Sequence, residues 1–189
     1  MSTNQKAKQK EDSKQRILNV ASRLFRKQGF KATGVDQLMR EAGLTAGGFY
    51  AHFASKEALF EQTLKFALEH SRKRLQKDTE HLSGEFKTKA IIKRYCSPAH
   101  RDFPDKGCVL PALAAEIHQG NKLTDELIAN YIEKWAALIQ EHLPNELSPK
   151  QKKIFALQLI SRSVGAILLA RVTRNYSLSD DILEAAQEL

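Results

Sequence analysis

The sequence predicts an all-α fold of about nine helices, and three observations support this prediction. Apolar residues recur every three to four positions over most of the chain, the spacing that places them on one face of a helix. No stretch alternates apolar and polar residues as a half-buried strand does. Glycine, proline and serine interrupt the helical pattern at the points where turns are expected. We therefore expect helices joined by short loops and no sheet.

Most of the positive charge lies in the first third of the chain. The 189 residues have a net charge of +8. Residues 1–56 contain eleven Lys or Arg and four acidic residues, whereas residues 57–189 contain nineteen and eighteen. A basic segment followed by a nearly neutral body is typical of a protein that binds nucleic acid.

We expect a cytoplasmic protein with no membrane partner. The most apolar stretch, residues 164–172, is interrupted by Arg171 and is shorter than the ~20 residues that cross a bilayer. The first residues contain no apolar segment of the kind found in secretion signals.

The N-terminal region is predicted to begin with an arm and a helix. Residues 1–12 are polar and aperiodic, so we expect a flexible basic arm. Ser13 is placed to cap the first helix, whose apolar positions repeat at helical spacing. Gly29 is expected to end this helix.

Residues 35–53 have the pattern of a helix-turn-helix, a pair of helices that reads DNA. Two short helices are expected at residues 35–42 and 46–53. Gly43 lies at the turn between them, because glycine adopts a left-handed conformation without strain. Thr45 is placed to cap the second helix of the pair. The outward-facing positions of this second helix would be Ala46, Gly47, Tyr50 and His52.

Two features of this region are unfavourable for stability and favourable for binding DNA. Gly47 and Gly48 each cost ~1 kcal/mol relative to alanine inside a helix, but they let the backbone approach a nucleic acid; alternatively, they relieve crowding against another helix. Lys56 follows the expected cap Ser55, where the helix dipole disfavours a cation. A phosphate there would contact both the free N–H groups and the ammonium; the alternative is a solvated lysine.

The rest of the chain is predicted to form six further helices. They are expected after Ser55, at residues 85–96, 109–118, 124–143 and 149–173, and from Ser177 or Ser179 to the end. Residues 97–107, with two prolines and several changes of charge, are expected to form the longest irregular connection.

The helix expected at residues 149–173 predicts a homodimer. It is apolar around most of its circumference and therefore needs burial on most sides. With the last helix it would form a four-helix bundle about a two-fold axis; the alternative is that these residues form only the core of a monomer. The predicted interface residues are Ile160, Val164, Ile167, Leu168, Leu178 and Ile182.

Motifs within residues 13–60 are specific enough to indicate a family. They are Gly29-Phe30, Thr33, Leu38, Ala42-Gly43-Leu44-Thr45, Gly47-Gly48-Phe49-Tyr50, His52-Phe53 and Ser55-Lys56-Glu57-Ala58-Leu59. This region resembles the DNA-binding domain of the TetR family of bacterial transcriptional regulators. The resemblance implies a helix-turn-helix domain at residues 13–60 and a helical domain at residues 61–189 that binds an effector and dimerises.

The resemblance also implies how double-stranded operator DNA is bound. Phosphates would be contacted by the residues at the matching positions, Thr33, Thr45, Tyr50, His52 and Lys56. Bases would be reached from Ala46, Gly47 and Gly48. Because these three residues offer almost no hydrogen-bonding side chain, we expect Gln37, Arg40, the basic arm and DNA shape to contribute to specificity.

A small-molecule effector is a further implication of the resemblance, and the sequence leaves its identity open. Candidate pocket residues are Tyr95, Cys108, His118, Tyr131, Trp135 and Arg162. The favoured interpretation is a repressor that an inducer releases from a palindromic operator. The alternatives are a transcriptional activator, an architectural protein that binds DNA without an operator, and a repressor that senses oxidants or electrophiles through Cys108.

We expect no enzyme, metal or cofactor. No nucleotide-binding loop, hydrolase motif or zinc-protease motif occurs. Cys96, His100 and Cys108 are close enough in sequence to suggest part of a metal site, but no fourth ligand lies nearby and zinc usually has four.

Overall fold

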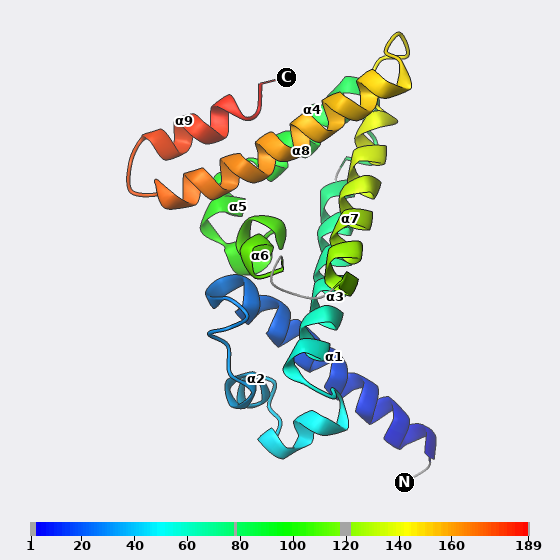
Figure 1. The fold of residues 1–189 in the computed structure, drawn as a ribbon, viewed down its shortest axis with the longest axis vertical. Helices are drawn as coiled ribbons and strands as arrows, with labels where there is room; N and C mark the ends of the chain where they lie inside the picture. Colours follow the sequence, from blue (N-terminus) through cyan, green and yellow to red (C-terminus); the bar gives the residue numbers. More distant parts are fainter. Residues whose placement is uncertain (1–2, 78, 118–121, 189) are drawn as a thin grey trace.

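In a computed structural model, the described residues are 3–77, 79–117 and 122–188, and they contain helices and no strand (Figure 1). The all-α prediction is therefore confirmed. The elements are α1 (Thr3–Gln28), α2 (Val35–Glu41), the 3-10 helix η1 (Ala46–Ala51), α3 (Lys56–Gln76), α4 (Gly84–Tyr95), α5 (Pro98–Asp102), the 3-10 helix η2 (Pro104–Lys106), α6 (Leu110–Ile117), α7 (Lys122–Gln140), α8 (Pro149–Val172) and α9 (Leu178–Ala185).

The helices α1, α2, η1 and the first turn of α3 form a small head around one apolar core. Phe25, Leu38, Phe49 and Phe53 are almost completely buried in this core. As predicted, Gly29 ends α1 with φ +90° and Gly43 makes the turn between α2 and η1 with φ +69°. Residues other than glycine rarely adopt these values, so the two glycines set the path of the chain through the head.

The helix α3 leaves the head and continues into the body, which comprises the later helices. Ser55 caps it as predicted, because its hydroxyl accepts a hydrogen bond from the N–H of Ala58 at 3.1 Å. In Figure 1, α3 runs upward from the head beside α7, and α4, α8 and α9 lie at the far end of the molecule. The predicted domain boundary at residue 60 thus falls inside one continuous helix.

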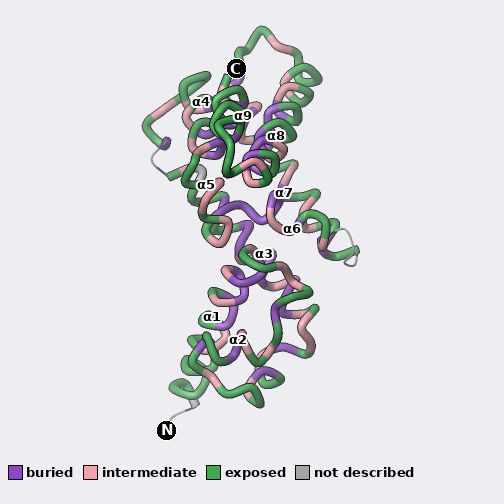
Figure 2. Tube along the Cα trace, turned by 90° about the vertical axis from the view of Figure 1, so that its left-hand side faces the viewer, coloured by how far each residue is buried: buried purple, intermediate pink, exposed green. Residues whose placement is uncertain are grey.

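The expected flexible arm is wrong for the residues that the structure describes. Helix α1 begins at Thr3, so Ser13 lies in its interior and is not its cap. Residues 4–12 are exposed (green near the N-terminus in Figure 2). Their Gln, Lys, Ala and Glu residues are good helix formers, and no glycine or proline occurs among them. The helix formed by the buried part of α1 therefore continues into these exposed residues.

Three other local predictions need correction. Residues 46–51 form a 3-10 helix and not an α-helix, with i→i+3 bonds such as Gly48 N–H to Thr45 O at 3.0 Å. The Thr45 side chain makes no capping hydrogen bond. The segment 97–107, expected to be irregular, contains α5 and η2, because Ser97 caps a helical turn that begins at Pro98.

Candidate nucleic-acid interface and body pocket

The outer side of the helix-turn-helix carries most of the residues predicted to face DNA. Arg40, Thr45, Ala46 and Gly47 are exposed. Tyr50 is 75% exposed although its ring packs edge-on against the buried Phe49. An aromatic hydroxyl held this far into solvent by a buried neighbour is well placed to reach a phosphate.

The two adjacent glycines of η1 face different directions. A Cβ atom on Gly47 would meet no atom within 4 Å, whereas one on Gly48 would lie 3.6 Å from both Met39 Cε and Thr45 Oγ1. Neither contact is a clash, so crowding within the head does not explain either glycine. Gly47 is the one whose missing side chain leaves open space on the exposed surface.

Lys56 is held in place at the start of α3. Its ammonium lies 4.4 Å from the centroid of the Phe30 ring and 3.5 Å from the carbonyl oxygen of Lys31. This cation–π contact keeps the charge beside the free N–H groups of the 21-residue helix α3. The arrangement is suited to binding a phosphate at that point.

His52 links the helix-turn-helix to the exposed part of α1. Burial lowers the pKa of His52, and the nearby charges of Lys10 and Lys14 lower it further. Lys14 Nζ also lies 5.9 Å from the centroid of the Phe53 ring. The lysines on this face of α1 therefore lie close to the end of η1.

The structure contradicts one predicted contact residue and places another in a network of surface hydrogen bonds. Thr33 is fully buried, and its hydroxyl donates a hydrogen bond to the carbonyl oxygen of Gly29 at 2.6 Å. This residue holds the turn after α1 and does not face solvent, so the structure contradicts its assignment to phosphate binding. Gln37 is half-buried, and its amide bonds with Gln28 and Glu41 on the same surface.

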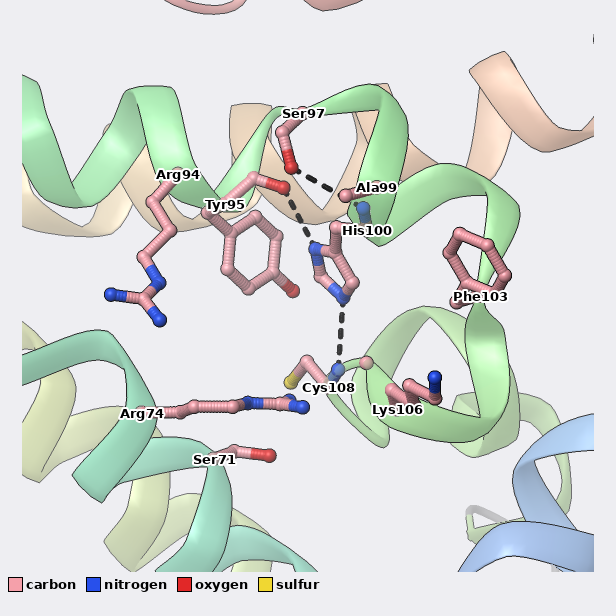
Figure 3. A pocket seen from close by; sticks show the side chains of 11 residues that line it. Ser71, Arg74, Arg94, Tyr95, Ser97, Ala99, His100, Phe103, Lys106 and Cys108 are labelled. Carbon is pink, nitrogen blue, oxygen red and sulfur yellow. Dashed lines mark hydrogen bonds between the residues drawn. The ribbon is translucent and has the colours of Figure 1, made fainter. Parts of the chain in front are cut away.

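A cavity of about 230 Å³ lies in the body between α3, α4 and the segment 97–108 (Figure 3). Polar lining comes from Ser71 and Arg74 of α3 and from Arg94 of α4. The remaining lining residues are Tyr95, Ser97, Ala99, His100, Phe103, Lys106, Gly107 and Cys108. In Figure 3 the side chain of Arg74 extends from α3 toward Cys108, whereas Arg94 of α4 lies on the side of the Tyr95 ring away from His100.

His100 forms one rigid wall of this cavity. Its Nδ1 bonds with the carbonyl oxygen of Tyr95 at 2.7 Å, and its Nε2 accepts a hydrogen bond from the N–H of Cys108 at 2.9 Å. This pattern requires the neutral ring, and burial lowers the pKa of His100 to about 4. The ring also packs on Gly107, where an added Cβ would lie 2.5 Å from it. Because both ring nitrogens are already bonded, His100 is not a metal ligand.

Several buried hydroxyls near the cavity have no oxygen or nitrogen partner among the described residues. Ser71 and Tyr95, both lining residues, are 3% and 2% exposed; the Ser71 hydroxyl is unpaired, and the Tyr95 hydroxyl pairs only with the Cys108 thiol. The hydroxyl of Tyr131 also pairs only with this thiol. Buried polar groups are normally paired in folded proteins, and unpaired ones often mark a binding site.

The residues predicted from the sequence to bind the effector include only part of the cavity lining. Tyr95 and Cys108 line the cavity, but Tyr131 and Trp135 line a separate pocket beside α7. Arg162 lies on the exposed side of α8, so its assignment to the same site is wrong, and His118 lies outside the described residues. Arg74, Arg94, Lys106 and Ser71 were missed, since an isolated cation in a helical sequence is more often a solvated surface residue.

Two sets of hydrogen bonds join the body to the head. Arg26 of α1 donates to the carbonyl oxygen of Gly107, a cavity residue, at 2.6 Å. Glu116 of α6 accepts from the backbone N–H groups of Phe30 and Lys31 at 2.9 and 3.0 Å. A change in the segment 97–108 or in α6 therefore acts directly on the last turn of α1 and on the start of the turn that follows it.

The outer face of α8 is apolar and uncovered in the single chain. Leu157, Leu168 and Val172 are 37%, 46% and 77% exposed, and Leu178 of α9 is 52% exposed. By length and composition α8 is the one described helix that is apolar enough to cross a membrane, with 39% of its most apolar window buried. Ile160 and Ile167 are buried inside the chain, so their assignment to a dimer interface is wrong.

Known proteins are similar in sequence to the helix-turn-helix head and to nearly the whole of this chain. The family described as bacterial regulatory proteins, tetR family, matches residues 17–63. The HTH-type transcriptional regulator LmrA of Bacillus subtilis is 26% identical over 167 residues, which cover 87% of this chain and 89% of LmrA. The regulator YerO of the same organism is 34% identical over 94 residues, and the matched part covers half of this chain and only 32% of YerO.

Solved structures share the fold over nearly the whole chain. A TetR transcriptional regulator from Chloroflexus aurantiacus superposes with a TM-score of 0.81 at 24% identity and covers 95% of this chain and 92% of its own. The reduced form of NemR from Escherichia coli gives 0.74 at 22% identity, with 93% and 95% covered. The matching head, the full-length relative and the shared helical body agree, and this chain is a member of the TetR family of helix-turn-helix, DNA-binding transcriptional regulators.

Proposed function

We propose that this regulator is a cytoplasmic homodimeric repressor that binds a palindromic operator and is released by a small-molecule effector. The observation that carries the proposal is the combination of an exposed helix-turn-helix with a separate cavity that is hydrogen-bonded to it through Arg26 and Glu116. The family is one of regulators and not of enzymes, so the cavity is interpreted as a binding site without catalysis.

Pairing through α8 and α9 supports the palindromic operator. The uncovered apolar face of α8 needs a partner in water, and a second copy offers the same face. Gly165 has no atom within 4 Å of an added Cβ, so the single chain leaves room for a close helix crossing there. Two heads related by a two-fold axis would fit half-sites about 34–36 Å apart along one side of the duplex.

Release would follow from a shift of the segment 97–108 when the cavity is filled. Movement of Gly107 pulls on Arg26, and movement of α6 pulls on the turn at Phe30 and Lys31 through Glu116. Either change alters the angle of the head relative to the body. Heads that no longer match the spacing of the two half-sites lose affinity for the operator.

Sensing through a reactive thiol receives no support from the geometry. Cys108 is 3% exposed, and burial raises the pKa of its thiol. A reactive cysteine needs an accessible thiolate and therefore a lowered pKa.

Selection of bound sequences from a random DNA pool tests the proposal. The expected result is an inverted repeat that binds about a thousandfold more tightly than random duplex and that recruits two chains per site. Binding of all sequences with equal affinity would point to an architectural protein. A selected site without two-fold symmetry would argue against the dimer.

A further inference from the structure

The side chain of Glu116 extends from α6 of the body to the turn that follows α1. One carboxylate oxygen accepts a hydrogen bond from the N–H of Phe30 at 2.9 Å, and the other accepts one from the N–H of Lys31 at 3.0 Å. The carboxylate also lies close to Gly29, where an added Cβ would be 3.1 and 3.2 Å from its two oxygens. Hydrogen bonds to an ionised acceptor are stronger than neutral ones. Glu116 therefore holds two consecutive peptide groups of the head to the body.

The same two turn residues hold Lys56 at the start of α3. The Lys56 ammonium lies 4.4 Å from the centroid of the Phe30 ring and 3.5 Å from the carbonyl oxygen of Lys31. The Phe30 ring also lies 4.5 Å, centroid to centroid, from the ring of Phe60, one helical turn beyond Lys56 in α3. The turn thus contacts α6 through its N–H groups and α3 through a ring and a carbonyl oxygen.

These contacts order a side chain that is otherwise flexible. A lysine carries its charge on a four-carbon stem with many rotamers, and a phosphate contact made by an unsupported lysine requires that stem to be ordered on binding. Support from Phe30 and Lys31 supplies part of this ordering in advance. The hydroxyl of Thr33 fixes the shape of the turn through its bond to the carbonyl oxygen of Gly29, whereas Glu116 fixes the position of the turn relative to α6.

We propose that Glu116 is a positioning residue for DNA binding. It holds the turn at Phe30 and Lys31 so that the Lys56 ammonium stays beside the N–H groups at the start of α3, where it contacts a backbone phosphate. The inference requires duplex binding through Lys56 and neither a palindromic operator nor an effector.

General electrostatics predicts the opposite sign for a substitution at this residue. DNA is a polyanion, so removal of an acidic side chain is expected to raise affinity slightly. Glu133 is the matched control, because it is exposed on α7 and has no hydrogen-bond partner among the described residues. Glu133→Gln is expected to leave the affinity unchanged or to raise it by up to about twofold. Glu116→Gln, whose amide keeps only one acceptor oxygen, is expected to lower it about threefold or more.

A double-mutant cycle on the full chain tests the inference by fluorescence anisotropy. The probe is a random-sequence duplex at several salt concentrations, because a phosphate contact carries no sequence information. Lys56→Gln is expected to weaken binding about fivefold and to reduce the slope of log affinity against log salt by about one. In the Lys56→Gln background, Glu116→Gln is expected to change the affinity by less than about 1.5-fold, because the residue it positions is absent.

Three outcomes would overturn the inference. They are Glu116→Gln binding as tightly as Glu133→Gln, an equal loss from Glu116→Gln with and without Lys56, and an unchanged affinity and salt slope in Lys56→Gln. A head that is merely destabilised gives the second outcome, and urea unfolding of each variant measures that stability directly. A chain that selects an inverted repeat but shows no coupling retains the proposed function and refutes the role of Glu116. Coupling on random duplex without any selected operator refutes the proposed function alone.

Discussion

At the scale of single residues, Gly47 and Gly48 allow the exposed side of the helix-turn-helix to be tested atom by atom. An added methyl group on Gly47 meets open space, whereas one on Gly48 contacts Met39 and Thr45 inside the head. Gly47→Ala is expected to weaken operator binding about tenfold, a cost of about 1.4 kcal/mol, because the methyl group separates the backbone from DNA. Gly48→Ala is expected to stay within about twofold. Anisotropy with the selected operator measures both.

Neither glycine variant is expected to destabilise the head. Replacing glycine by alanine at a compatible backbone position stabilises a protein by roughly 0.4–1 kcal/mol through the unfolded state. Denaturant unfolding of both variants is the control. Equal loss of DNA affinity in the two variants would mean that the direction of the missing side chain is irrelevant.

His100 makes the stability of the body depend on pH. Its pKa of about 4 in the folded chain lies below the ordinary value of 6.5, so the unfolded chain binds more protons between these values. The free energy of unfolding therefore rises with pH across this window, by up to about 1.4 kcal/mol per pH unit from this residue, and the gain is lost as the pH falls toward 4.

Urea unfolding at a series of pH values from 4.5 to 7 measures this contribution. In His100→Gln the slope of the unfolding free energy against pH is expected to decrease by about one proton equivalent. His52 and the carboxylates titrate in both proteins and cancel in the comparison. Parallel curves for the two proteins would show that His100 is not held neutral.

At the scale of elements, the helical conformation of the first residues of α1 places their lysines on two opposite faces. Lys6, Lys10 and Lys14 are four residues apart and share one face, which lies beside His52, whereas Lys8 lies on the opposite face. A flexible arm would make no such distinction. Lys10→Gln is expected to reduce the slope of log affinity against log salt by about one, the loss of one phosphate contact, and Lys8→Gln to leave it unchanged.

Anisotropy titrations with operator and with random duplex, at several salt concentrations, check this prediction. The loss in Lys10→Gln should be the same for both duplexes, because a phosphate contact carries no sequence information. Equal effects of the two substitutions would indicate that residues 3–12 leave the helical conformation when DNA is bound.

At the scale of the whole molecule, two adjacent residues of α8 separate dimerisation from folding. Leu168 is 46% exposed on the outer face, and Ile167 is fully buried inside the chain. Leu168→Asp is expected to yield a folded monomer near 21.3 kDa that binds operator weakly. Ile167→Ala is expected to remain dimeric and to lose roughly 2–5 kcal/mol of stability, as for other deletions in a core.

Analytical ultracentrifugation and denaturant unfolding distinguish the two effects. A dimer that survives Leu168→Asp would place the interface away from the exposed face of α8. An unmodified chain that sediments as a monomer at micromolar concentration would remove the physical basis for a palindromic operator.

The helical class, the helix-turn-helix and the family could all be predicted from the order of the amino acids. These depend on local signals, namely apolar periodicity, Gly29 and Gly43 at positive φ, and the cap at Ser55, which act over a few residues and need no knowledge of distant contacts. The same local reasoning failed at residues 3–12, because the helix there is an extension of a segment that is packed elsewhere in the head.

Which residues face the core, the solvent or one another depends on how the helices pack. Periodicity marks Ile167 and Leu168 alike as apolar, but the packing of α8 buries one and exposes the other. Arg74 and Arg94 are 20 positions apart in the sequence and line one cavity only because α3 and α4 bring them there. A binding site is a set of side chains from several elements that converge in space, and this convergence is a property of packing and not of any one segment.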